Sequence, residues 1–208
     1  MTWSIGEIGA LATKAARGSG MEWGLAEETG YAIQWLQKHH LPGVSALCKY
    51  LSWRQNGTLS IWPDETDKRG YYCPILTGAA YGDGIFGDEV KLPRIRLPLL
   101  LVPFVALLAT ETPIKIEMRN IVFLLTMNGF GCSTDGTSML IESSTCQISM
   151  TYDVSLPIRN FKDMKLPRVP KNTAACINVL NEFAKKTYAP ATDASRLAGA
   201  GSGLSDND

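Results

Sequence analysis

The segment Ile-Lys-Ile-Glu-Met-Arg-Asn-Ile-Val-Phe-Leu-Leu-Thr, residues 114–126, decides the fold class. It predicts two strands, 114–118 and 121–126, with only Arg119 and Asn120 between them. A parallel crossover needs a dozen or more residues, so such a short connection makes the two strands antiparallel neighbours. The sequence therefore predicts an antiparallel sheet in the middle of the chain.

More of the sheet is expected on both sides of this hairpin. Three further strands are predicted at residues 58–62, 137–142 and 145–154, and the first of these alternates with period two. Phe104–Ala109 is predicted to be a buried helix that uses Pro103 at its first position. The glycine-rich stretches 82–89 and 127–136 are predicted to be loops.

The N-terminal third is predicted to be helical. Ser4 and Glu7 form a capping box, and apolar residues then recur at helical spacing, which predicts a helix over residues 4–17 with Gly18 as a left-handed C-cap. A second helix is predicted over 22–40 and a third over 44–51. The second contains Gly24 and Gly30, which suggests that another backbone approaches it closely.

The C-terminal part is predicted to be an extended segment (157–171), a helix from Asn172 or Thr173 to about Thr187, and a glycine-rich tail. The fold class is therefore α+β: a helical N-terminal third, a mainly antiparallel sheet, and a C-terminal helix with its tail. We expect a single domain over 1–208, made of a helical part (1–56), a sheet part (57–156) and the C-terminal helix and tail (157–208).

Composition restricts the possible functions. The 208 residues contain 20 Lys and Arg and 20 Asp and Glu, and this balance argues against nucleic-acid binding and against a polybasic membrane-surface protein. The most apolar stretch, 97–109, is shorter than the roughly 18–20 residues that span a bilayer, and two prolines interrupt it, which predicts a core segment. The N-terminus lacks the features of a secretory signal, so we expect a cytoplasmic protein.

Cysteine and histidine positions argue against a disulfide framework and a zinc site. The five cysteines are widely spaced and odd in number, and they form no Cys-x-x-Cys pair. The two histidines, His39 and His40, are adjacent, and adjacent side chains on a helix point about 100° apart. We therefore expect five reduced cysteines and no metal ligands.

The strongest catalytic candidates are Glu27 and Glu28 in Trp23-Gly-Leu-Ala-Glu-Glu-Thr-Gly. Desolvation against an indole raises the pKa of a carboxyl group, so a glutamate beside Trp23 could serve as a general base. The alternative is that both carboxylates are solvated and favoured by the helix dipole. Arg17 could clamp an anionic carboxylate of a substrate, with Trp23 as a further binding residue.

The tail supplies the remaining candidates. Three glycines at 199, 201 and 203 do not match Gly-x-Gly-x-x-Gly and follow no predicted strand, so a dinucleotide site is excluded. The tail could be disordered, or it could fold over a pocket or into a neighbouring subunit. In the latter case its substrate-binding residues would be Arg196, Ser205, Asp206 and Asp208.

Two predicted loops contain residues that are weaker candidates for a catalytic or metal-binding site. Cys132, between glycines, could be a nucleophile, but no base is near it in the sequence and a β-turn is the plainer interpretation. Asp83, Asp88 and Glu89 lack EF-hand spacing, so we expect a solvated loop near an entrance.

Motifs at both ends of the chain resemble one family. They are Ser4-x-x-Glu-Ile, Lys14-Ala-Ala-Arg-Gly-x-Gly, Trp23-Gly-Leu-Ala-Glu-Glu and Ser195-Arg-x-x-Gly-Ala-Gly-x-Gly-Leu-x-Asp-Asn-Asp. The family is bacterial, of about this length, and catalogued as a domain of unknown function. The resemblance implies a bacterial cytoplasmic protein and brings no activity or cofactor.

Two functions remain open. The first is a small-molecule-binding enzyme or enzyme subunit that uses the carboxylates and arginines named above. The second is a non-catalytic assembly or accessory protein whose tail docks on a partner, which includes a second copy of this chain. The position of the tail distinguishes them, because a tail that converges on Glu27 favours a site.

Overall fold

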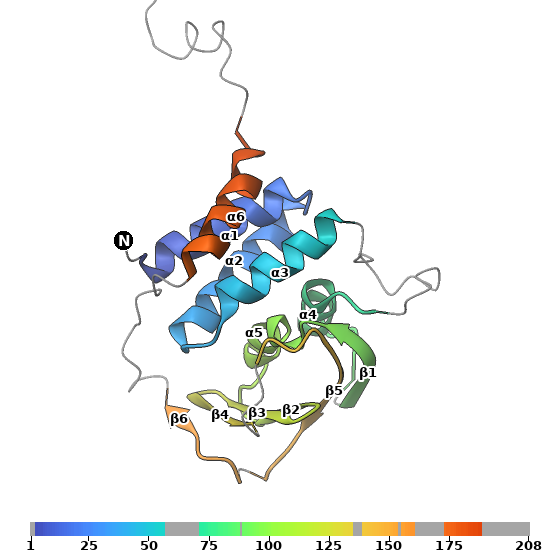
Figure 1. Ribbon diagram of the computed structural model, residues 1–208. Helices are drawn as coiled ribbons and strands as arrows, with labels where there is room; N and C mark the ends of the chain where they lie inside the picture. Colours follow the sequence, from blue (N-terminus) through green and yellow to red (C-terminus); the bar gives the residue numbers. More distant parts are fainter. Residues whose placement is uncertain are drawn as a thin grey trace, which may run out of the picture.

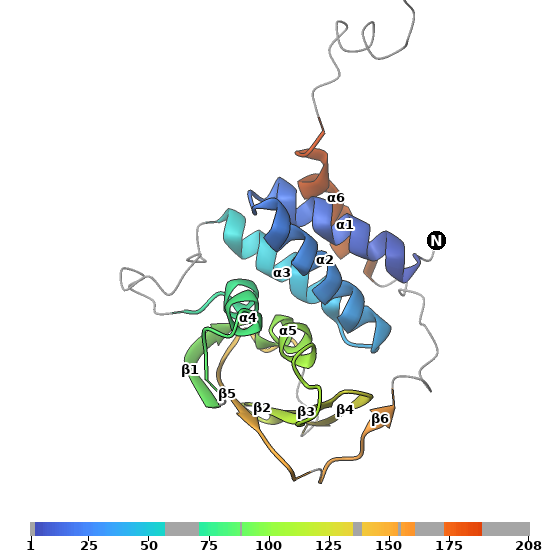
Figure 2. The same ribbon diagram turned by 180° about the vertical axis from the view of Figure 1, so that it is seen from behind.

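The computed structural model describes residues 3–56, 71–87, 89–134, 139–153, 155–160 and 173–188. Within them, four helices form one layer: α1 (Ile5–Gly18), α2 (Trp23–Lys38), α3 (Gly43–Gln55) and α6 (Ala174–Lys185). A sheet forms the opposite side of the molecule. Two short helices, α4 (Pro74–Gly82) and α5 (Val102–Ala106), lie between the helical layer and the sheet (Figures 1 and 2).

The sheet is antiparallel between every pair of neighbouring strands. Its strand order is β1-β5-β2-β3-β4-β6. The strands are β1 (Glu89–Arg96), β2 (Ile114–Met118), β3 (Ile121–Thr126), β4 (Gly129–Thr134), β5 (Ser143–Met150) and β6 (Arg159–Asn160). The predicted hairpin is confirmed in bounds and in register, with Met118 opposite Ile121 and Ile114 opposite Leu125. The α+β prediction is likewise confirmed.

The capping box at the start of α1 is confirmed. The backbone N–H of Glu7 donates to the Ser4 hydroxyl (3.2 Å), and the N–H of Ser4 donates to the Glu7 carboxylate (2.7 Å). These hydrogen bonds hold the pKa of Glu7 below its ordinary value. The predicted C-cap is wrong: Gly18 remains helical, and Gly20 carries the positive φ of 92°. A glycine is required at position 18 because α6 crosses α1 there, and a Cβ would overlap the Phe183 carbonyl.

Helix α2 packs closely against α1, and Gly30 is one reason. A Cβ at Gly30 would overlap the Thr13 hydroxyl and lie 3.1 Å from the Gly9 carbonyl oxygen. A Cβ at Gly9 would in turn overlap the Gln34 side chain. The predicted role of Gly30 in a close approach is therefore confirmed, whereas a Cβ at Gly24 would meet nothing within 4 Å, so the same prediction is wrong there.

Two predictions for the sheet region are wrong, and both failed at glycine or serine-rich sequence. Residues 127–136 were expected to be a loop, but Gly129–Thr134 is strand β4. A Cβ at Gly129 would overlap the Arg159 carbonyl of β6, so the glycine reflects a close strand neighbour rather than a turn. Residues 139–142, expected within a strand, lie outside the named strands, and β5 begins only at Ser143.

Most of the apolar stretch 97–109 lies in the core, as predicted, but Leu107 and Leu108 are exposed. It forms a 3-10 turn, η1 (Pro98–Leu100), followed by α5, and Leu97 to Val105 are all buried. Helix α5 packs on β2 and β3 on one side and against α2 and α4 on the others. This apolar segment therefore packs between the helical layer and the sheet. No helix among the described residues combines the length and apolar character needed to cross a membrane.

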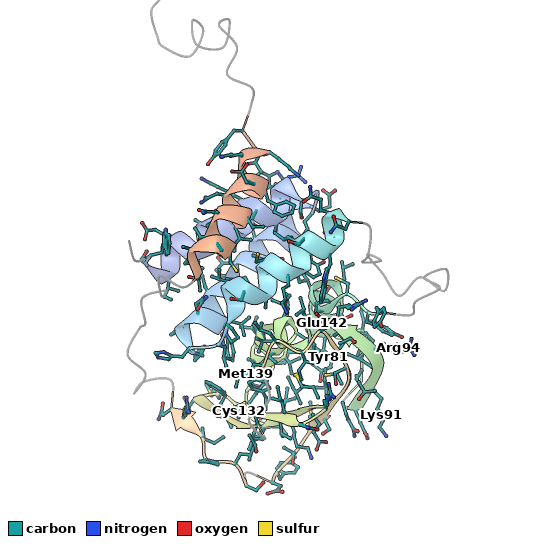
Figure 3. The ribbon with its side chains drawn as sticks, viewed as in Figure 1. Tyr81, Lys91, Arg94, Cys132, Met139 and Glu142 are labelled. Atoms are coloured by element: carbon teal, nitrogen blue, oxygen red, sulfur yellow. The ribbon has the colours of Figure 1, made fainter. Side chains whose placement is uncertain are left out.

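None of the five cysteines forms a disulfide in the structure, and the thiols of Cys48 and Cys176 are hydrogen-bond neighbours. Cys132 lies in β4 on the sheet (Figure 3), not in the β-turn expected from its glycine neighbours. Burial raises the pKa of the Cys132 thiol, which disfavours the nucleophilic thiolate. The predicted strand 58–62 and the C-terminal tail lie outside the described residues.

Candidate functional site

A cavity lies between α2, α4 and α5. Its volume is about 660 Å³, inside the range of about 300–1,000 Å³ typical of small-molecule pockets. Helix α2 supplies one wall, namely Glu28, Tyr31, Ala32, Gln34, Trp35 and Lys38. The other wall is formed by Ala79, Gly82 and Asp83 at the end of α4, by Pro103, Phe104, Leu107 and Leu108 from α5 and just after it, and by Ile5 of α1.

The lining is apolar over most of its surface. Tyr31 and Leu107 are 71% and 73% exposed, and Phe104 is buried beneath them. Phe104 is seated against α4 because Gly78 has no Cβ, and a Cβ there would overlap the phenyl ring. Large apolar side chains left in solvent beside a hollow are typical of a surface that receives a ligand.

The wall formed by Trp35 is fixed from behind by an aromatic cluster. The ring centroid of Trp35 lies 4.1 Å from that of His39 and 5.8 Å from that of Phe130 in β4. His39 is buried and its Nδ1 lies 2.6 Å from the Trp35 carbonyl oxygen. Burial holds the pKa of the imidazole below its ordinary value. The cluster connects the cavity wall to the sheet and orients the indole.

Two carboxylates, Glu28 and Asp83, line one end of the cavity. Desolvation by burial, and then the negative charge of Asp83, raise the pKa of Glu28 above its ordinary value. Asp83 caps the C-terminal end of α4, where the helix dipole disfavours a negative charge. Within the described ranges, neither carboxylate forms an ion pair with a lysine or arginine. This end of the cavity therefore carries two like charges without a protein counter-ion in the part of the chain that the structure describes.

The predicted site residues divide into three groups. Glu27 and Glu28 are both exposed on α2, and Glu28 lines the cavity whereas Glu27 lies outside the lining. Arg17 and Trp23 lie together but away from the cavity: Arg17 Nη1 donates to the Met21 carbonyl (2.6 Å), and its guanidinium lies 5.3 Å from the Trp23 ring centroid. These contacts connect α1 to α2. The tail residues Arg196, Ser205, Asp206 and Asp208 lie outside the described residues.

Sequence reasoning missed most of the lining. Tyr31, Trp35 and Lys38 follow Glu28 at intervals of three and four residues, which places them along one side of a helix. That periodicity could have extended the site from Glu28 along α2. Asp83 was expected in a loop near an entrance, and it does line the cavity. The contribution of α5 could not have been found, because it depends on how α5 packs between the layers.

A second hollow, of about 710 Å³, lies between α1 and α6 and is lined mainly by polar residues such as Lys14, Asn181 and Glu182. Tyr188 is the one aromatic residue in its lining, whereas Tyr31, Trp35 and Phe104 line the first cavity. Among the described residues, no group of three or more His, Cys, Asp or Glu could hold a metal ion. The cavity beside α2 is therefore the candidate site.

Comparison with known proteins adds a family description but no activity. A family model described as "Protein of unknown function (DUF3726)" matches residues 3–68, which include α1 to α3. The match covers about a third of the chain and supports the resemblance at the N-terminal end. Searches of curated proteins and of solved structures found no match.

Proposed function

We propose that this protein binds a small organic molecule in the cavity between α2, α4 and α5, and that the molecule has an apolar body and a protonated amine. The observation that carries the proposal is the combination of an apolar hollow of about 660 Å³ with two carboxylates at one end. The aromatic and aliphatic lining would receive the apolar body, and the carboxylates would receive the amine.

The amine follows from electrostatics. Partial desolvation and repulsion from Asp83 both disfavour the charged form of Glu28 and raise its pKa. A cation between the two carboxylates would relieve the repulsion and form charge-assisted hydrogen bonds. An anionic ligand group at the same position would increase the repulsion.

Glu28 is also the described residue best suited to exchange a proton with a bound molecule. Burial and the charge of Asp83 raise its pKa above the ordinary value, and it lines the cavity, within reach of a bound molecule. Glu27, the other catalytic candidate, does not line the cavity. If the protein is an enzyme, we therefore assign the acid–base role to Glu28.

Five unpaired cysteines and the family resemblance support a bacterial cytoplasmic setting.

A thermal-shift screen of metabolites against wild-type protein and an Ala79→Leu variant tests the proposal. Ala79 lines the cavity, and a leucine there would occupy part of it. Ligands that bind the folded state raise the Tm by mass action. We expect amines with apolar bodies to raise the Tm of the wild type and to lose this effect in Ala79→Leu. Ala175→Leu, an exposed alanine of α6, is the matched control and should respond like the wild type. If every stabilising compound acts equally on both variants, the cavity is not the site.

A further inference from the structure

Lys38 lines the same cavity as Glu28 but lies ten residues further along α2. At a rise of 1.5 Å per residue, their backbones are about 15 Å apart along the helix axis. Tyr31, Ala32 and Trp35 line the cavity between them. The hollow therefore follows α2 from an acidic end to a basic end.

The packing of α1 against α2 confirms which end is which. Gly30 lies against Thr13, and Gln34 lies against Gly9, so the two helices run antiparallel and successive turns of α2 meet successively earlier turns of α1. Continuing this register brings Ile5 towards Lys38, and Ile5 is the α1 residue in the lining. Asp83 acts on Glu28 at the other end. The two ends of the cavity are therefore built from different elements and carry opposite charges.

Shape supports a single elongated occupant. Glu28 and Lys38 lie about 15 Å apart along α2 and both line the same hollow of about 660 Å³, which suits one elongated molecule that reaches both. Lys38 lies in the last turn of α2, where the helix dipole stabilises a cation. In the described ranges, no carboxylate forms an ion pair with Lys38.

We propose that the ligand is elongated and bipolar: its protonated amine lies at Glu28 and Asp83, its apolar body lies against Trp35 and Phe104, and a carboxylate or similar anion lies at Lys38. This inference rests on the proposed small-molecule function and adds the anionic group and the length of the ligand.

Three probes of equal chain length separate the contributions: 12-aminododecanoic acid, dodecylamine and dodecanoic acid, each used below its micelle concentration. Isothermal titration is carried out on the full-length wild type and on Lys38→Met and Glu28→Gln. Matched controls are Lys49→Met, an exposed lysine of α3, and Glu27→Gln, the neighbour of Glu28 outside the cavity. Circular dichroism and the Tm verify that each variant is folded.

We expect Lys38→Met to weaken binding of 12-aminododecanoic acid by about threefold to tenfold and to leave the Kd of dodecylamine unchanged, since a single ion pair is lost. Glu28→Gln should weaken both amines by a similar factor and leave dodecanoic acid unaffected. The controls should match the wild type for all three probes.

The outcomes separate the two proposals. In one outcome dodecylamine binds the wild type and Ala79→Leu weakens that binding, but Lys38→Met changes the Kd of neither amine or changes both equally. This result would refute the bipolar ligand and leave the small-molecule site standing. If none of the probes binds, or if Ala79→Leu changes no Kd, both proposals fail together.

Discussion

The two sides of α2 differ in how they meet their neighbours. On one side, Gly30 brings the helix so close to α1 that a single added methyl group would overlap Thr13. On the neighbouring side, about a quarter to a third of a turn around the helix, Tyr31, Trp35 and Lys38 line a hollow of about 660 Å³ against α4 and α5. The same helix therefore has a closely packed face and an open face.

The difference shows how a cavity can be kept open beside a closely packed helix. Close helix packing at glycines fixes the position of the α2 backbone, because neither helix can move nearer and separation would expose buried surface. Side chains on the neighbouring face can then stand apart from α5 without the layers collapsing. The closely packed face supplies the rigidity that the open face needs.

The largest effect is expected where the closely packed face is altered. Alanine favours a helix interior over glycine by about 1 kcal/mol, yet Gly30→Ala should lower the free energy of unfolding by about 1–3 kcal/mol, because the new Cβ overlaps Thr13 and approaches the Gly9 carbonyl. Gly24→Ala in the same helix meets nothing within 4 Å and should not destabilise the protein. Urea denaturation of both variants measures the contrast, and equal effects would show that α1 and α2 are not closely packed at Gly30.

The next largest effect is expected at the start of α1, the helix against which the closely packed face of α2 lies. Ser4→Ala removes the hydroxyl that accepts the Glu7 N–H, and we expect a loss of about 0.5–2 kcal/mol in the free energy of unfolding. Ser4→Asp preserves a capping acceptor and should retain most of the stability. Denaturant unfolding of the two variants is the measurement, and a loss of the same size in both would remove the capping box from the account.

The open face should tolerate a larger side chain. Ala79→Leu directs new apolar atoms into the cavity rather than into a packed interface, so we expect the free energy of unfolding to change by less than about 1 kcal/mol. Chemical denaturation in parallel with Gly30→Ala gives the comparison directly. A loss from Ala79→Leu as large as that from Gly30→Ala would mean that the cavity face is packed as closely as the other.

The smallest effect concerns the aromatic cluster behind the cavity wall. Burial lowers the pKa of His39 in the folded protein, so the unfolded chain binds the proton more readily. The neutral His39 side chain therefore makes its full contribution to stability above pH about 6.5, the ordinary pKa of the unfolded chain. That contribution is lost as the pH falls below this value towards the lower pKa of the folded state. Stability measured from pH 7.5 to pH 5 should decrease, His39→Gln should reduce the slope, and His40→Asn, at an exposed position with φ 61°, should keep it. An unchanged slope in His39→Gln would assign the pH dependence to other groups.

Local signals in the sequence predicted part of this structure well. The hairpin 114–126 and the capping box of α1 depend only on neighbouring residues, and both were predicted correctly. Strand β1, which contains Pro93, was not predicted. It lies at an edge of the sheet, where β5 is its one neighbour among the named strands and Tyr72 bridges to Ile95 on its other side, and its register shifts between Leu92 and Ile95. Edge strands and bulges are where proline is tolerated.

The candidate site depended more on tertiary structure. Glu28 was a candidate from its sequence context, but the reason it differs from Glu27 is the direction in which α2 faces α4 and α5. Glycines were ambiguous for the same reason: Gly129 marks a close strand neighbour, whereas Gly24 marks no contact. Such distinctions require the positions of segments far apart in the sequence.

The central claim, that the open face of α2 binds a small molecule, is tested most directly by an NMR titration of the ¹⁵N-labelled protein with the strongest amine from the screen. We predict that the backbone amides of Glu28, Ala32, Gly82 and Leu107 shift in a saturable manner and yield one common Kd, while that of Thr13 in α1, which packs against Gly30, does not. Shifts confined to α1 and α6, or scattered over the surface without saturation, would contradict the assignment of this cavity as the site.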